Sequence, residues 1–236
     1  MLSEAGVEYL KQHAPIGCRD HYTKDTLQAH GIDAYFSGCL TLTLDSHKVN
    51  DDERGDAIYI VDPLFNFPSK KKFLTSLNSI RKYIKTGDVF KLNAIDKILK
   101  QHFSQEILDQ AQYIEHELAS NTYSEDEKFN IAKDLLHKYA RAKLVITSRI
   151  HCALPCLALG TPVIFIHGFD SLGDTCRFNG LTDLFNTIRV DAKNHQSVLN
   201  LAHTQRIDLN SIPKNPTTYQ KLTPHLKKTC KAFIQN

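Results

Sequence analysis

Two short segments of this sequence are almost entirely apolar, and a helix-like segment separates them. Residues 144–147 read LVIT and residues 162–166 read PVIFI, with HCALPCLAL between them. A strand that is apolar at every position is buried on both faces, which is typical of a parallel sheet. Gly160 suits the left-handed residue that ends a helix, so the region predicts a strand, a helix and a second parallel strand.

The same alternation extends over the rest of the chain, so we predict an α/β fold whose parallel sheet is covered by helices on both faces. Ser124 with Glu127 three residues later is typical of a helix N-terminus. The further strands expected are AIYIVD (57–62), AQYI (111–114) and IRVD (188–191), and the further helices expected are 71–84, 124–141 and 217–234.

The N-terminal residues repeat the pattern on a smaller scale. The sequence predicts a helix over 4–13, a strand at PIGC (15–18), a second helix, and strands at DAYF (33–36) and CLTLTL (39–44). Thr23 is the expected cap of the second helix and Gly31 its expected end. The polar, turn-rich stretch 45–55 is the expected domain boundary.

Composition excludes several function classes. With 29 Lys and Arg against 26 Asp and Glu, the net charge of +3 is too small to indicate a nucleic-acid partner, and Lys70–Lys72 reads as a solvated helix start. Glu4 and Glu8 interrupt any signal peptide, so we expect a cytoplasmic protein. The longest apolar run, 152–166, contains two prolines and is too short to span a membrane.

The six cysteines show no CxxC spacing, and a reducing compartment would leave them as small buried thiols. His151, Cys152 and Cys156 lie close enough in sequence to suggest a metal site. No second ligand pair stands nearby, so no metal is expected.

The turn at residues 147–151 is the candidate site. In an open parallel sheet, ligands bind beyond the carboxyl ends of the strands, where helix N-termini present free N–H groups. If Thr147 or Ser148 caps the helix, the N–H groups around Ile150 face a pocket to which Arg149 and His151 add positive charge. Such a pocket suits an anion.

Pro155 predicts where this helix starts. Because its ring cannot donate to the carbonyl of His151, the helix is expected to begin at or after His151, with 149–151 in an exposed turn. A structural alternative stays open, in which Arg149 pairs with a carboxylate and His151 is a hydrogen-bonded structural residue.

Two separate segments resemble the polysaccharide pyruvyl transferase family. They are SRIHCALPCLALGTPVIFI with the following CRFNGLTDLF, within residues 143–185, and PIGCRDHYTKDTLQAHGIDAYFSGCLTLTL, within residues 15–44. The resemblance implies two Rossmann-like domains facing across a cleft, as in GT-B glycosyltransferases. It also implies transfer of the enolpyruvyl unit of phosphoenolpyruvate onto two sugar hydroxyls, which forms a pyruvate ketal and releases phosphate.

The resemblance also implies roles for individual residues. His151 matches the family's acid/base, and the expected substrate-binding residues are Arg19, Ser148, Arg149, Ile150 and Arg177. Arginine grips carboxylate and phosphate in a bidentate fork, and an imidazole can exchange protons near neutral pH. The alternatives are an ion pair with Asp20 for Arg19 and a surface position at a helix start for Arg177.

Family members carry a longer stretch before the segment that matches PIGCRD. The resemblance therefore predicts residues 1–50 as the remnant of a truncated first domain and 51–236 as the second Rossmann-like domain with a final crossover helix. The expected partners are a saccharide or lipid-linked saccharide acceptor and a chain that supplies the missing domain. No cofactor is expected beside phosphoenolpyruvate as donor. A nucleotide-sugar glycosyltransferase and a non-catalytic anion-binding domain remain alternatives.

Overall fold

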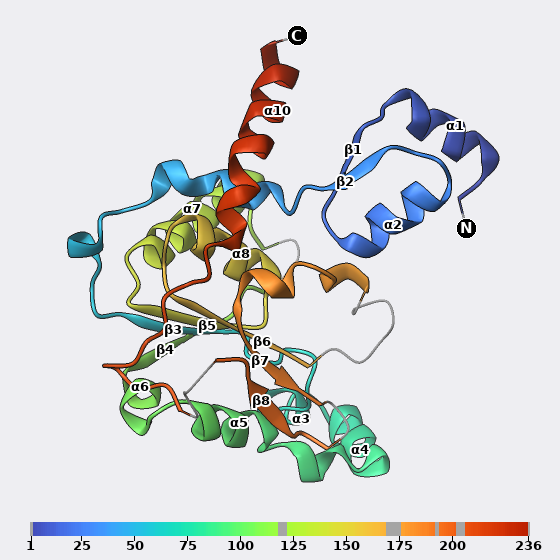
Figure 1. Cartoon of the computed structure of the whole chain (residues 1–236). Coiled ribbons are helices and arrows are strands. Elements are labelled where there is room, and N and C mark those ends of the chain that lie inside the picture. The colour runs from blue at the N-terminus through green and yellow to red at the C-terminus, as the bar shows by residue number, and fades with distance from the viewer. Residues whose placement is uncertain (1, 118–121, 169–175, 192–193, 202–205, 236) are drawn as a thin grey trace.

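The computed structural model describes residues 2–117, 122–168, 176–191, 194–201 and 206–235. Its centre is a six-stranded sheet in the order β4-β3-β5-β6-β7-β8, parallel except for the antiparallel edge strand β8 (Figure 1). The six strands are β3 Ile58–Val61, β4 Ala111–Ile114, β5 Leu144–Thr147, β6 Val163–His167, β7 Asn186–Val190 and β8 Ser197–Leu199. The first five include all strands predicted for residues 57–191.

Helices cover both faces of this sheet, as predicted. They are α3 Lys70–Phe73, α4 Leu77–Thr86, α5 Ala94–His102, α6 Gln105–Gln110, α7 Glu125–Ala140, α8 Ile150–Ala158 and α10 Thr223–Gln235. Short 3-10 helices are η1 Leu40–His47, η2 Asp51–Glu53, η3 Asp88–Lys91, η4 Thr182–Leu184 and η5 Thr218–Lys221.

The strand residues divide between two hydrophobic clusters, one on each face of the sheet. Tyr59 and Val61 of β3 pack in the cluster that includes residues of α7, α8 and α10. Ile58 and Ile60 pack in the cluster that includes residues of α5 and α6. All four side chains are buried, which explains why β3 is apolar at each position.

Two helix-terminus signals are confirmed. Ser124 caps α7 in a capping box with Glu127, and Gly160 has a φ of +71° just after α8. These local signals act within a few residues, so the sequence places the two helix ends correctly.

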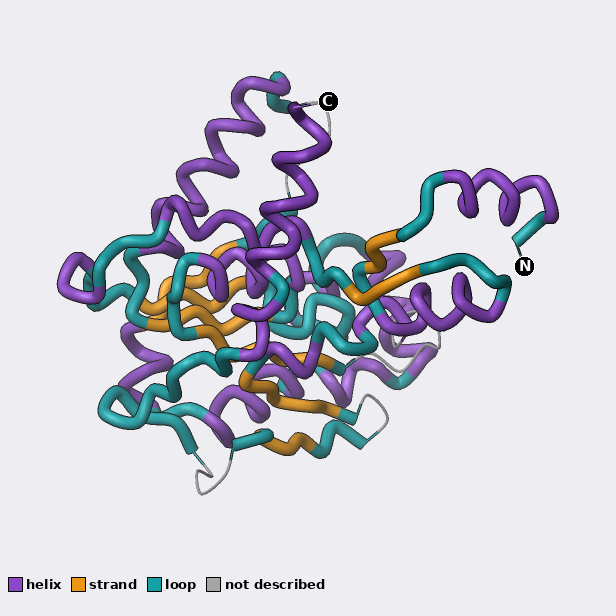
Figure 2. Tube along the Cα trace, turned by 45° about the horizontal axis from the view of Figure 1, so that its top comes forward, coloured by secondary structure: helices purple, strands orange, loops and turns teal. Residues whose placement is uncertain are grey.

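The N-terminal residues form a smaller unit beside the main sheet (Figure 2). It contains α1 Glu4–Gln12, β1 Ile16–Cys18, α2 His21–Ala29 and β2 Ala34–Phe36, with β1 and β2 paired in parallel. Cys18, Leu27, Ile32 and Ala34 form its own buried cluster. The division of the chain into domains stays a prediction.

Two predictions for the N-terminal region are wrong. The segment CLTLTL alternates like a strand, yet it forms the 3-10 helix η1 and packs against α8 and α10. Its threonine hydroxyls hydrogen-bond groups nearby in the sequence, and Thr43 Oγ1 donates to the Leu40 carbonyl. Such local bonds compete with the backbone hydrogen bonds of a strand. Helix α2 is capped by Asp20, whose carboxylate accepts from the N–H of Thr23, and not by Thr23 itself.

Other differences concern helix breaks. The helix predicted over 71–84 is two helices, because Ser76 caps a new helix by accepting the N–H of Ser79. The final helix is divided likewise into η5 and α10. Helices α5 and α6 and strand β8 were not predicted.

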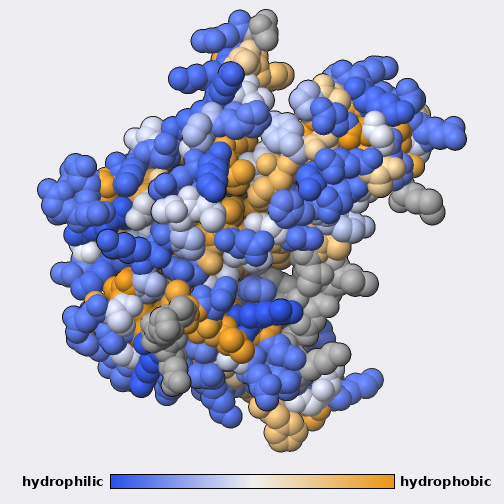
Figure 3. Space-filling model, in the orientation of Figure 1, coloured by the Kyte–Doolittle hydropathy of each residue, from blue (hydrophilic) through white to orange (hydrophobic). Residues whose placement is uncertain are grey.

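The visible surface is largely hydrophilic, with apolar side chains gathered along the base of α10 and between α10 and the N-terminal unit (Figure 3). Among the described residues, no helix has the length and apolar character required to cross a membrane.

Candidate anion-binding site

The carboxyl ends of β3 and β5 lie where the sheet changes direction. From β3 the chain continues to β4 on one side, and from β5 it continues to β6 on the other. Ligands of doubly wound sheets bind in the crevice at this switch point. Asp62 directly follows β3, and Ser148 and Arg149 directly follow β5. The topology therefore puts the predicted turn at the usual ligand position of such sheets.

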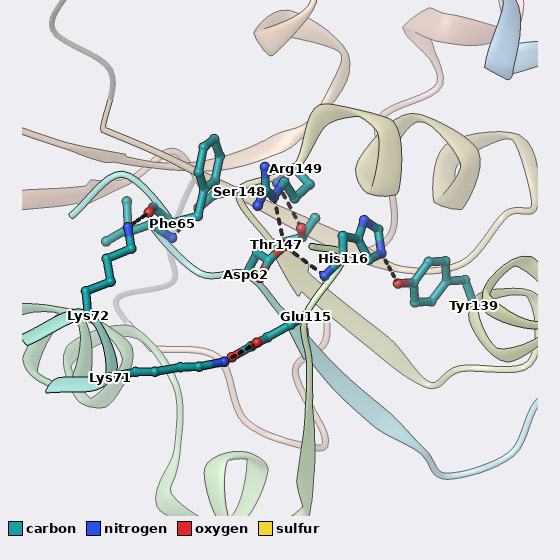
Figure 4. Close-up of polar contacts among 11 residues, drawn as sticks. Asp62, Phe65, Lys71, Lys72, Glu115, His116, Tyr139, Thr147, Ser148 and Arg149 are labelled. Atoms are coloured by element: carbon teal, nitrogen blue, oxygen red, sulfur yellow. Dashed lines mark hydrogen bonds and ion pairs between the residues drawn. The ribbon is translucent and has the colours of Figure 1, made fainter. Parts of the chain in front are cut away.

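Two contacts fix the orientation of Arg149 (Figure 4). Its Nε donates to Asp62 Oδ2 over 2.8 Å, and its guanidinium lies over the Phe65 ring, 3.8 Å from the ring centroid. Pairing with a carboxylate, the structural alternative, is thus observed. The side chain is still 29% exposed, and within the described residues no partner is found for its two terminal nitrogens. The end of the guanidinium fork is available to an anion.

Asp62 joins the ends of three neighbouring strands. Its Oδ2 accepts from Arg149, after β5, and from the backbone N–H of His116, after β4, over 3.1 Å. The side chain is only 9% exposed. The backbone φ of +42° lies in the left-handed region, which Asp tolerates better than most residues. Asp62 therefore holds both Arg149 and His116 at the crevice.

The start of α8 differs from the prediction. The helix begins at Ile150, with Arg149 as N-cap residue. Neither Thr147 nor Ser148 is the cap: Thr147 Oγ1 accepts the N–H of Arg149 over 2.9 Å, and Ser148 Oγ accepts the N–H of Leu64 over 2.7 Å. Both hydroxyls are buried, so they satisfy backbone groups of the two strand ends.

The exposed turn expected over 149–151 is wrong for Ile150 and His151, because both belong to α8, which also includes Pro155. The first turn tightens instead, with the N–H of Cys152 donating to the Arg149 carbonyl over 3.0 Å. Ile150 and His151 are the first two helical residues, whose N–H groups no carbonyl of the helix can accept. The helix dipole adds partial positive charge here, which favours an anion.

A pocket of 740 Å³ lies at this crevice, and five of the six predicted site residues line it: Ser148, Arg149, Ile150, His151 and Arg177. The other lining residues are Phe65, Lys72, His116, Glu117 and Phe178. The basic and imidazole side chains come from four parts of the chain: Lys72, His116, Arg149 with His151, and Arg177. The pocket is large enough for a small dianion together with part of a second molecule.

Lys72 was interpreted from the sequence as part of a solvated helix start. It is exposed in α3, but it also lines the pocket, and its Nζ donates to the Phe65 carbonyl. Burial lowers the pKa of Lys72, and Arg149 acts in the same direction, whereas Glu117 opposes them. No local pattern in KKK distinguishes Lys72 from its neighbours.

His151 is exposed and lines the pocket. Its imidazole hydrogen-bonds the buried thiol of Cys39, to which Thr41 Oγ1 also donates over 3.3 Å. Burial raises the pKa of Cys39, but these hydrogen bonds outweigh burial and bring it to about 7. His151 therefore has the structural contact that the alternative anticipated, and it still borders the pocket.

Arg19 does not line this pocket within the described residues. The alternative, an ion pair with Asp20, is not found either, although both side chains are described. The N–H of His21 donates to the Asn179 carbonyl over 3.0 Å, so the segment that carries Arg19 contacts the segment that carries Arg177.

Among the described residues, no group of three or more His, Cys, Asp and Glu side chains could hold a metal ion. The fold and the site define an α/β protein, compatible with a Rossmann-like fold, with a pocket lined by Lys72, Arg149 and Arg177 at the switch point of its sheet. The polysaccharide pyruvyl transferase family model matches residues 3–167, and the chain belongs to that family of transferases. The match ends before Arg177. No curated protein and no solved structure matches the chain.

Proposed function

We propose that this protein transfers the enolpyruvyl unit of phosphoenolpyruvate to a saccharide and forms a pyruvate ketal. The observation that carries the proposal is the set of contacts made by the Arg149 guanidinium. Asp62 and Phe65 hold its guanidinium through one nitrogen and one face, and the two terminal nitrogens are left at the pocket. This is the arrangement that bidentate binding of a carboxylate or a phosphate requires.

Phosphoenolpyruvate carries two anionic groups, so its site needs several donors. Arg149 and the N–H of Ile150 are adjacent donors at the start of α8, and Arg177 and Lys72 supply charge from two other segments. The hydroxyl of Ser148 accepts from Leu64 and keeps its own proton for donation. Arg19 stays a prediction from the family resemblance.

His151 is the proposed acid. In the first step an acceptor hydroxyl oxygen bonds to C2 of phosphoenolpyruvate and loses its proton to a base, while the imidazolium gives a proton to C3, which becomes a methyl group. In the second step another hydroxyl oxygen bonds to C2, the bond from C2 to the phosphate oxygen breaks, and phosphate leaves with the second proton. Imidazole is suited to the first transfer because it titrates near neutral pH.

The acceptor in this proposal is a saccharide, free or linked to a lipid, and the site of reaction is the cytoplasm. The GT-B-like arrangement of two domains stays a prediction, as does a partner chain that completes the first domain. The alternative of a nucleotide-sugar glycosyltransferase predicts a different ligand, so binding distinguishes the two functions.

The test begins with calorimetric titration of phosphoenolpyruvate, uridine diphosphate and guanosine diphosphate into the whole chain. We expect phosphoenolpyruvate alone to bind. Binding of a nucleoside diphosphate in its place would favour a glycosyltransferase.

His151→Gln then separates an enzyme from a binding domain. We expect phosphoenolpyruvate affinity within a few-fold of the parent and phosphate release reduced ~10²- to 10⁴-fold with a sugar acceptor. The matched control is His137→Gln, which changes an exposed histidine of α7 away from the pocket. Normal turnover of His151→Gln would show that this histidine is structural.

A further inference from the structure

Two cavities meet at a pair of histidines. Beside the 740 Å³ pocket lies a cavity of 410 Å³ between η1, α7 and α8. His116 and His151 line both cavities, and they come from different elements: His116 follows β4, and His151 lies in the first turn of α8. His116 was not identified from the sequence.

The imidazole of His116 is held from two sides (Figure 4). Its backbone N–H donates to Asp62 Oδ2 over 3.1 Å, and its Nε2 lies 2.5 Å from the hydroxyl oxygen of Tyr139. The other ring nitrogen points away from Tyr139 (Figure 4). A ring fixed in this way presents one defined nitrogen to the cavities.

Tyr139 determines which nitrogen carries the proton. The phenol is 2% exposed and hydrogen-bonds the thiol of Cys152. Burial and then Cys152 raise the pKa of Tyr139, as expected when the phenol donates to the sulfur. In the inference drawn here the phenol proton lies toward Cys152, and the oxygen of Tyr139 accepts from Nε2–H of His116 over their 2.5 Å contact. The neutral imidazole then has its lone pair on Nδ1.

The surroundings favour this neutral form. Burial lowers the pKa of His116, Arg149 acts in the same direction, and Asp62 opposes them. Among the described residues, the titratable and charged groups that contact it or line the two cavities with it include Asp62 after β3, Glu115 and Glu117 beside it in the chain, Lys128 and Tyr139 on α7, Arg149, His151 and Cys152 around the start of α8, Lys72 on α3, and Arg177. His116 is therefore a base at neutral pH.

We propose that His116, which lines the pocket together with His151, is the general base that takes the proton of the first acceptor hydroxyl through Nδ1. This inference rests on the proposed function. The hydroxyl oxygen bonds to C2, its proton passes to His116, and the proton that C3 gains comes from His151. His116 then returns its proton to solvent, and His151 takes one up, so the two histidines are restored for the next turnover.

The activity test uses His116→Gln and His116→Ala in the full chain. We expect phosphate release to fall ~10²- to 10⁴-fold in both variants, with phosphoenolpyruvate affinity within about three-fold of the parent. Added imidazole should restore part of the activity of His116→Ala, because the adjoining cavity admits a small base. His137→Gln is the matched control. Full activity of either variant, or loss without any rescue, would overturn the role of base.

A second measurement does not depend on turnover. Nitrogen NMR of isotope-labelled histidine, assigned by loss of the signal in His116→Gln, should show the Nε2–H tautomer in the parent at neutral pH. In Tyr139→Phe the Nδ1–H tautomer should appear as well. A protonated ring or the Nδ1–H tautomer in the parent refutes the inference about His116, whereas failure of the parent to bind phosphoenolpyruvate refutes the proposed function.

Discussion

Replacing Arg149 by lysine should weaken phosphoenolpyruvate binding while keeping the charge of the site. Arginine can bind Asp62 through Nε and an anion through its two terminal nitrogens at the same time. Lysine has a single nitrogen, so it loses at least one charge-assisted hydrogen bond when both partners are present. It also loses the planar contact with Phe65.

The magnitude follows from that lost bond. A hydrogen bond to a charged group contributes roughly 1.5–3 kcal/mol, equivalent to about a 10- to 150-fold rise in Kd. Because the Arg149 side chain is 29% exposed, solvent screens the interaction, and we expect the lower part of this range, about 10- to 50-fold.

Calorimetry at fixed ionic strength measures this change, with thermal unfolding as the check on folding. Arg141→Lys is the matched control, since Arg141 is exposed at the end of α7 and does not line the pocket. An Arg149→Lys protein that is folded and binds phosphoenolpyruvate as tightly as the parent would remove Arg149 from the site, and with it the main support for the proposed function.

Three further predictions concern other parts of the chain. Arg54→Met should lower the free energy of unfolding in urea by about 2–4 kcal/mol, because Arg54 donates to the carbonyls of Ala140 and Leu159 at the ends of α7 and α8; parent-like stability would contradict this. Burial lowers the pKa of His102 below its ordinary value of 6.5, so the folded protein favours the neutral ring. The ring is neutral in both states above pH 6.5, and the free energy of unfolding falls as pH drops below 6.5, because the unfolded chain then binds the proton more readily. His102→Gln should therefore flatten the fall of Tm on acidification, and parallel curves would refute the assignment. Arg19→Ala should weaken phosphoenolpyruvate binding less than Arg149→Lys, since Arg19 does not line the pocket, and parent-like affinity would exclude it from the site.

The sheet and several helix ends could be predicted because their signals are local. Strand β3 is apolar at each position and β5 at every position before Thr147, which indicates burial on both faces without knowledge of their neighbours. The capping box of α7 likewise lies within four residues. The segment 39–44 shows the opposite case, because its strand-like alternation is overridden by packing against α8 and α10, more than a hundred residues away.

The candidate site was predicted only in part for the same reason. The turn at 147–151 carries its own signal, since a cationic residue and an imidazole follow a buried strand. His116 and Lys72 have no such signal, and they become part of the site only because the end of β4, which pairs with β3, and helix α3 reach the pocket at the turn after β5. Asp62 could have been suspected, because an acidic residue ends the predicted strand AIYIVD, but its partner Arg149 lies 87 residues later.

Two arginines of this chain show how a structural role differs from a binding role. Arg54 is 10% exposed, and its nitrogens are occupied by Asp51, by Thr161 and by the carbonyls at the ends of α7 and α8. These contacts use four of the five N–H groups of the guanidinium, so Arg54 cannot offer a two-nitrogen fork to a ligand. Arg149 is more exposed and, within the described residues, uses one nitrogen, with its aromatic contact on one face. The ion pair with Asp62 uses only Nε of Arg149 and orients the two terminal nitrogens. It therefore supports the binding of an anion by those nitrogens and does not compete with it.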